Sequence, residues 1–264
     1  STTILGAIDI SGAGGLDLDA AIANTDGSAG AASLDVNGAT NLGANVVTTG
    51  AQIYTGATTV SADISLKNTD NNVTFGDTLD SDGTPRDLTI DTDGNTGTIL
   101  FSGGVGQNNN FDVITITGNL DLDADIGADD FSAAGATSIA VSGASNLGGD
   151  VTTSGTQTYT GAVTLSGEAI NLKGTTIQFG STVAGGTQNL KVEGIMDLNG
   201  AMTNVGILEI TGASDIGAEI STTGTQTYTG AVTLSGAART LTATNNSAVL
   251  FSSTIDGTQD LTVA

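Results

Sequence analysis

The segment Gly224-Thr-Gln-Thr-Tyr-Thr-Gly-Ala-Val-Thr-Leu-Ser-Gly236 occurs almost letter for letter at Gly155–Gly167, and a more divergent copy lies at Gly50–Ser61. A catalytic site is assembled once, from different side chains that meet in one pocket. A segment that is copied along a chain is instead a structural unit that stacks on its own relatives. The repeat therefore predicts a solenoid.

Two further segments recur with the first. One precedes each copy, at Leu34–Gly43, Ile139–Gly148 and Leu208–Gly217. The other follows it and contains Phe75, Phe179 or Phe251, with an additional copy at Phe101. The tyrosines of the three copies, Tyr54, Tyr159 and Tyr228, are 105 and 69 residues apart. We interpret both spacings as whole numbers of coils of about 17 residues, which gives about 13–15 coils in all.

The composition favours strands over helices. The chain contains 39 Gly, one Pro and no Cys, His or Trp. No stretch repeats apolar residues at helical spacing over three turns, and Gly recurs about every ten residues. Abundant Thr, Val and Ile between Gly and Asn predict short strands and tight turns. We expect an all-β fold with essentially no helix, in one domain over residues 1–264, with repeat units at approximately 1–37 (partial), 38–118 (with an extra coil pair), 119–194 and 195–264.

Alternation within the repeated segment predicts which side chains are buried. Gln157, Tyr159, Val163 and Leu165 share one parity, which we place inside, and the intervening threonines are expected to face water. Gly161 lies between the two halves. It either continues one strand or marks a bend, and the sequence leaves both alternatives open.

The charge limits the partners. There are 28 acidic and five basic residues, for a formal net charge of −23, and the basic residues are scattered. Nucleic acid is therefore an unfavourable partner. No apolar run approaches the roughly 18 residues of a membrane span. The absence of cysteine is compatible with a secreted bacterial surface protein.

The phrases TGTQTYTGAVTLSG, FGSTVAGGTQNLKV and FSSTIDGTQDLTV resemble the repeats of large bacterial exoproteins of the filamentous-haemagglutinin type. The resemblance covers most of the chain, but the family's N-terminal secretion domain has no counterpart here. It implies a right-handed parallel β-helix, a secreted or cell-surface location, and an adhesive or matrix role. It implies no particular binding residue.

One acidic cluster is a candidate metal site. Carboxylate oxygens are the ligands that Ca²⁺ prefers, and this makes calcium the expected ion, although no cofactor is expected to be required. The alternative is a solvated strand face, because the first three acids alternate with Leu and Ala. The cluster consists of Asp121, Asp123, Asp125, Asp129 and Asp130.

A second acidic set lies on turns, where Asp commonly accepts hydrogen bonds from nearby backbone N–H groups. The same residues are a second metal candidate. The set consists of Asp77, Asp80, Asp82, Asp91 and Asp93.

The sequence favours a structural or adhesive segment of an extracellular filament or adhesin, and we expect no enzymatic activity. A Ca²⁺-stabilised acidic binding module of a surface protein is the alternative. A polysaccharide-acting β-helix enzyme is third, because no His or Cys is present for base or nucleophile chemistry. The expected partners are the chain itself, end to end or within a longer solenoid, and a host or neighbouring-cell surface. Stacked coils leave backbone groups open at both ends, and such edges recruit other strands.

Overall fold

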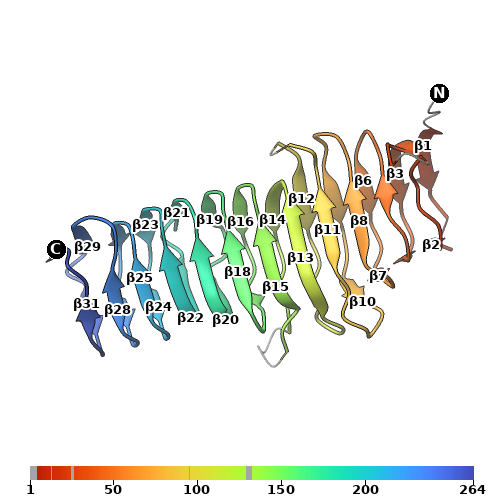
Figure 1. The fold of residues 1–264 in the computed structure, drawn as a ribbon. Helices are drawn as coiled ribbons and strands as arrows, with labels where there is room; N and C mark the ends of the chain where they lie inside the picture. Colours follow the sequence, from red (N-terminus) through yellow and green to blue (C-terminus); the bar gives the residue numbers. More distant parts are fainter. Residues whose placement is uncertain (1–4, 13, 25–26, 95, 129–132) are drawn as a thin grey trace.

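The computed structural model describes residues 5–12, 14–24, 27–94, 96–128 and 133–264. These residues form 32 strands and no helix. All strand pairs between successive turns are parallel, and the chain winds into a β-solenoid of about 11 turns (Figure 1). The predicted fold class is therefore confirmed. The described part of the chain has no helix long and apolar enough to cross a membrane.

Each turn contributes strands to three faces, which we number in the order in which the chain visits them. Face 1 is one continuous sheet of 13 strands. Face 2 begins as a four-stranded sheet and continues through single bridges at Leu79, Val105, Ile126 and Val151. Face 3 forms most of the 15-stranded sheet, which joins the later strands of face 2 where two long strands cross the corner between the faces.

Face 1 consists of β1 (Leu5–Ile10), β3 (Ala31–Val36), β6 (Gln52–Tyr54), β9 (Val73–Phe75), β12 (Thr98–Phe101), β14 (Asn119–Leu122), β16 (Ser145–Leu147), β19 (Val163–Leu165), β21 (Val183–Ala184), β23 (Met202–Val205), β26 (Ile220–Thr222), β29 (Arg239–Ala243) and β32 (Leu261–Val263). Face 2 consists of β2 (Leu16–Leu18), β4 (Thr40–Leu42), β7 (Thr58–Val60), β10 (Leu79–Ser81), β17 (Val151–Thr152), β24 (Leu208–Ile210), β27 (Gln226–Tyr228) and β30 (Val249–Phe251). Face 3 consists of β5 (Val46–Val47), β8 (Ile64–Lys67), β11 (Leu88–Asp91), β13 (Phe111–Thr117), β15 (Ala136–Val141), β18 (Thr156–Tyr159), β25 (Ser214–Ile216), β28 (Val232–Leu234) and β31 (Ile255–Asp256). Faces 2 and 3 share β20 (Ala169–Phe179) and β22 (Asn189–Leu198).

The turns are longer and fewer than the spacing of the repeated tyrosines predicted, which was about 17 residues per coil and about 13–15 coils. Leu34 pairs with Gln52, 18 residues on, whereas Val73 pairs with Ile99, 26 residues on. Corners of different length contribute to this variation: the segment 82–87 separates β10 from β11, whereas the segment 61–63 separates β7 from β8 on the preceding turn. About 11 turns at the usual strand spacing make a rod of roughly 50 Å.

The core is a single column of inward side chains, and the predicted parity is confirmed. Gln157, Tyr159, Val163 and Leu165 are buried. Gly161 marks the bend: β18 ends before it on face 3 and β19 begins after it on face 1. The odd-numbered side chains point inward on both sides of that bend, so a single alternation of buried and outward residues runs through two faces.

The repeated segments lie on three different faces. In the first set of repeated segments, which we call the first unit from here on, β3, β6 and β9 stack in consecutive turns on face 1. The equivalent strands of the second unit, β15, β18 and the end of β20, stack on face 3. Those of the third unit, β24, β27 and β30, stack on face 2. The expectation of whole coils between repeats is therefore wrong, because a unit can start on any face provided that its own three strands remain in register.

Aromatic stacking holds each unit together. In every unit the tyrosine ring packs on the phenylalanine one turn later, with interplanar angles of 13–17°. The pairs and their centroid distances are Tyr54–Phe75 at 5.1 Å, Tyr159–Phe179 at 5.9 Å and Tyr228–Phe251 at 5.1 Å. Such pairs stabilise a core by about 0.5–1.5 kcal/mol beyond the area they bury.

Candidate functional site

The first predicted acidic cluster is spread along the chain rather than gathered around one point. Asp121 points outward from β14, and one of its carboxylate oxygens accepts a hydrogen bond of 2.8 Å from the Asn146 side chain. Asp125 lies in the next corner and accepts a 2.7 Å bond from the backbone N–H of Asp150. Asp123 is exposed between them. These contacts join successive turns.

Asp129 and Asp130 lie outside the described residues. Within the ranges that the structure describes, no three His, Cys, Asp or Glu side chains come close enough to hold a metal ion. Because two of its members are not described, the five-residue calcium site stays a prediction.

Acids of the second set organise turns and neighbouring strands. Asp82 accepts a 3.1 Å bond from the backbone N–H of Thr84 and forms an ion pair of 2.8 Å with Arg86. Hydrogen bonds from that guanidinium are the main reason that the pKa of Asp82 is lowered. Asp80 accepts bonds from the backbone and side chain of Asn108, at 3.0 and 2.9 Å.

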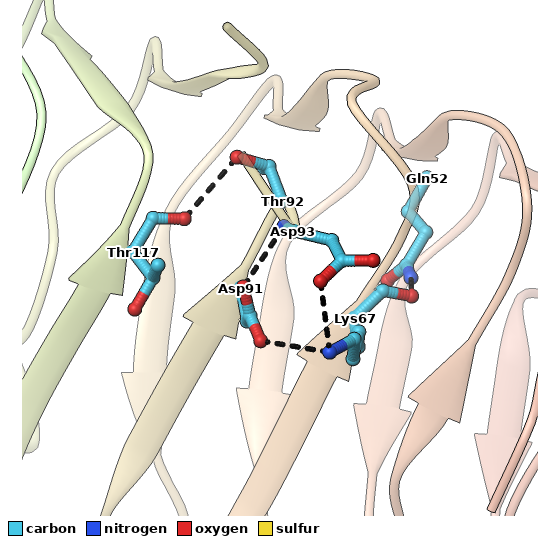
Figure 2. A network of polar contacts seen from close by, with 6 residues as sticks. All are labelled: Gln52, Lys67, Asp91, Thr92, Asp93 and Thr117. Carbon is cyan, nitrogen blue, oxygen red and sulfur yellow. Dashed lines mark hydrogen bonds and ion pairs between the residues drawn. The ribbon is translucent and has the colours of Figure 1, made fainter. Parts of the chain in front are cut away.

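Asp91 and Asp93 share one lysine on the adjacent strand (Figure 2). Lys67 Nζ lies 3.1 Å from Asp91 and 3.4 Å from Asp93. The hydrogen bond to Asp91 is the largest cause of the raised pKa of Lys67. The backbone of Lys67 takes part as well, because its carbonyl accepts a 2.9 Å bond from the buried Gln52 side chain. This network fixes a corner of the solenoid.

A surface groove of about 460 Å³ opens along face 2, over β20, β22 and β24. Its floor is a row of outward side chains in direct register, Asn171, Lys191 and Glu209. Ile207 forms an apolar wall and is 49% exposed. The complete lining is Asp150, Ala169, Ile170, Asn171, Asn189, Leu190, Lys191, Ile207 and Glu209.

The electrostatics of the groove are mixed. Asp150 is partly desolvated, and this burial is the main cause of its raised pKa; nearby Asp125 adds to it. Lys191 pairs with Glu193, which raises the pKa of the lysine and lowers that of the glutamate. Asn171 donates its backbone N–H to Asp150 at 2.6 Å. A ligand in the groove would meet carboxylate, ammonium and amide groups beside an aliphatic surface, which suits hydrogen bonding and ion pairing.

Sequence reasoning did not find this groove. Four of its five polar residues, Asp150, Asn171, Lys191 and Glu209, follow one another at spacings of 21, 20 and 18 positions, and only the register of face 2 brings them together. The turn lengths vary, so no fixed period in the sequence predicts that register.

The fold places the chain in the class of β-solenoid repeat proteins. No family model, curated protein or solved structure matches it.

Proposed function

We propose that this chain is a structural and adhesive segment of a secreted or cell-surface filament or adhesin, of the filamentous-haemagglutinin type that its phrases resemble. The observation that carries the proposal is the single stack of about 11 turns with one closed core. Such a rod holds groups at a fixed distance and orientation, and its repeats can be added without a change of cross-section.

The surface chemistry supports an extracellular, solvated rod. The outward residues are mainly Thr, Ser, Asn and Asp, and the net charge of −23 opposes non-specific aggregation. The groove on face 2 suits contact with a partner, since it combines an exposed aliphatic residue with convergent polar groups.

A bead-retention assay tests the adhesive role. Beads coated with the chain should be retained on a cell or matrix surface more strongly than beads coated with an inert protein, and free chain should compete. The double variant K191A/I207S should reduce retention at least several-fold. Thr164→Ala, which changes an exposed side chain on face 1, should not. Retention equal to that of the inert protein would contradict the adhesive role.

Calcium stabilisation is a second candidate, favoured by carboxylates that oppose each other on adjacent turns. Asp9 pairs in register with Asp35, and Asp197 pairs with Asp215. Ca²⁺ that binds only the folded chain would raise the melting temperature, with a stabilisation that grows with the logarithm of the free Ca²⁺ concentration above the Kd. A calcium titration at constant ionic strength tests this candidate, and an unchanged melting temperature would contradict it.

A further inference from the structure

Two carboxylates of the groove on face 2, Asp150 and Glu209, form no ion pair with the residues that the structure describes. Lys191, the register partner of Glu209, pairs with Glu193 instead. The half-buried Asp150 side chain accepts one hydrogen bond, from the backbone N–H of Asn171. The exposed Glu209 side chain accepts none within the described part of the chain. A cationic group in the groove would give each carboxylate the ionic partner that it lacks.

These carboxylates lie at opposite ends of one row of outward side chains. Asn171 lies on the strand next to Asp150 and donates to it at 2.6 Å. Asn171 is in register with Lys191, which is in register with Glu209. The row therefore crosses three strand-to-strand steps, or about 14 Å at the usual spacing of about 4.8 Å. In an extended chain, residues four positions apart are separated by about 13 Å and point to the same side. The ends of the row thus match two such residues in a segment that lies along the solenoid axis.

The middle of the row and the wall of the groove offer two further contacts. The Lys191 ammonium has three N–H donors, and Glu193 takes one of them, so donors remain for an acceptor on a ligand. Ile207 stands two positions before Glu209 and places an exposed aliphatic surface beside that carboxylate. Lysine and arginine side chains pack their methylene stems on such surfaces while the charged group stays at polar atoms.

We propose that the groove binds an extended segment of a partner protein whose basic side chains stand four residues apart, with an acidic or hydroxyl residue midway between them. One basic side chain pairs with Asp150. The other packs on Ile207 and pairs with Glu209, and the residue midway accepts a hydrogen bond from Lys191. The proposal rests on the proposed function, for which it names the chemistry of the partner.

The length and the charge pattern of the row favour this occupant over others. A single metal ion or a small amine would reach only one of two carboxylates that lie about 14 Å apart. An acidic segment would place like charges at both ends of the row, which disfavours binding. The row reads acid, amide, base, acid, and a segment that alternates base, acceptor, base along one side complements it.

Peptide binding measured by fluorescence anisotropy tests the proposal. The probe is a labelled serine-rich peptide with two lysines four residues apart and one glutamate midway. The control peptide has the same composition and charge, but its lysines are three residues apart and point to opposite sides when extended. Physiological ionic strength screens the long-range attraction of either peptide to the net charge of −23. We expect the probe to bind at least several-fold more tightly than the control peptide.

Conservative substitutions locate the binding site. D150N and E209Q each remove one charge from an end of the row, and each should abolish most of the preference for the probe. D112N removes the same charge from an exposed carboxylate on β13 of face 3 and should leave the preference unchanged. Equal affinity of the native chain for the two peptides would overturn the proposal. An equal loss of preference in D112N and E209Q would overturn it as well.

The bead assay separates this proposal from the adhesive role. Retention of the beads together with equal affinity for the two peptides would overturn this partner and leave the adhesive role standing. Preferential binding of the probe without bead retention would support the proposed ligand of the groove and contradict the adhesive role.

Discussion

The phenol hydroxyl of Tyr159 donates a hydrogen bond of 3.1 Å to the side-chain carbonyl of Gln157, and both side chains are fully buried. The amide nitrogen of Gln157 in turn donates to the backbone carbonyls of Val151 and Lys173, each at 2.8 Å. The glutamine thereby satisfies two carbonyls on successive turns at a corner of the solenoid. The same Gln–Tyr bond occurs in the other two units, as Gln52 with Tyr54 at 3.1 Å and Gln226 with Tyr228 at 2.9 Å.

Replacing Gln157 with leucine tests this arrangement. The Val151 carbonyl and the phenol would lose their bonds to Gln157, whereas the Lys173 carbonyl would keep its 2.8 Å bond from the backbone N–H of Thr153. A buried polar group without a partner costs about 1–3 kcal/mol. We expect Gln157→Leu to lower the free energy of unfolding by at least that amount in urea denaturation. Thr158→Val, which changes the neighbouring outward side chain on the same strand, is the matched control and should have little effect. Equal effects of the two substitutions would contradict the role assigned to Gln157.

The buried tyrosines predict a loss of stability at alkaline pH. Burial raises the pKa of Tyr54, Tyr159 and Tyr228 far above the ordinary value of 10.0, because the phenolate would lose its hydration. The stabilising contribution is therefore fully present below about pH 10 and is lost as the pH rises toward the folded-state pKa. Phenolate absorbance should appear together with the loss of the strand signal in circular dichroism. Phenolate formation near pH 10 in a chain that is still folded would contradict the burial.

The bend at Gly161 predicts a steric requirement for glycine. A methyl group there would lie 2.2 Å from the backbone oxygen of Gly143 on the preceding turn. Gly161→Ala should therefore destabilise the chain by about 1–3 kcal/mol, the usual range for an overpacked site. Gly12 has open space around its Cβ position, so Gly12→Ala is the control. A Gly161→Ala chain with the unfolding midpoint of the native chain would show that successive turns are not in such close contact.

The sequence predicted the architecture well because alternation is a local property. Tyr159 and Leu165 are buried on either side of a bend that the sequence could not assign, since parity carries across it. Turn length was predicted poorly because it depends on corners, whose conformations do not follow a hydrophobic period. The three faces and the groove at Lys191 and Glu209 depend on the sum of all preceding turn lengths. An error in the predicted length of one corner therefore shifts every later predicted contact.

Carboxylates that face each other on adjacent strands predict that the melting temperature depends on salt concentration. Asp197 and Asp215 are register partners on adjacent strands, and one carboxylate oxygen of Asp215 is buried without a hydrogen bond. Like charges at that spacing destabilise the folded chain, and added salt screens them. Asp215→Asn should raise the melting temperature at low ionic strength and reduce its increase with NaCl. Asp256→Asn, opposite Thr233, is the control and should change both less. An unchanged salt dependence in Asp215→Asn would show that this pair does not contribute.

Ring-to-ring nuclear Overhauser effects test the central claim. This claim is that the tyrosine strand and the phenylalanine strand of each repeat stack in consecutive turns on the same face. The sample would be deuterated except for its three tyrosine and six phenylalanine rings. The account predicts a contact from each tyrosine to one phenylalanine, in the pairs Tyr54–Phe75, Tyr159–Phe179 and Tyr228–Phe251. Contacts from the tyrosines to Phe101 or Phe111 in place of these partners, or no contact at all, would contradict the register on which the three faces rest.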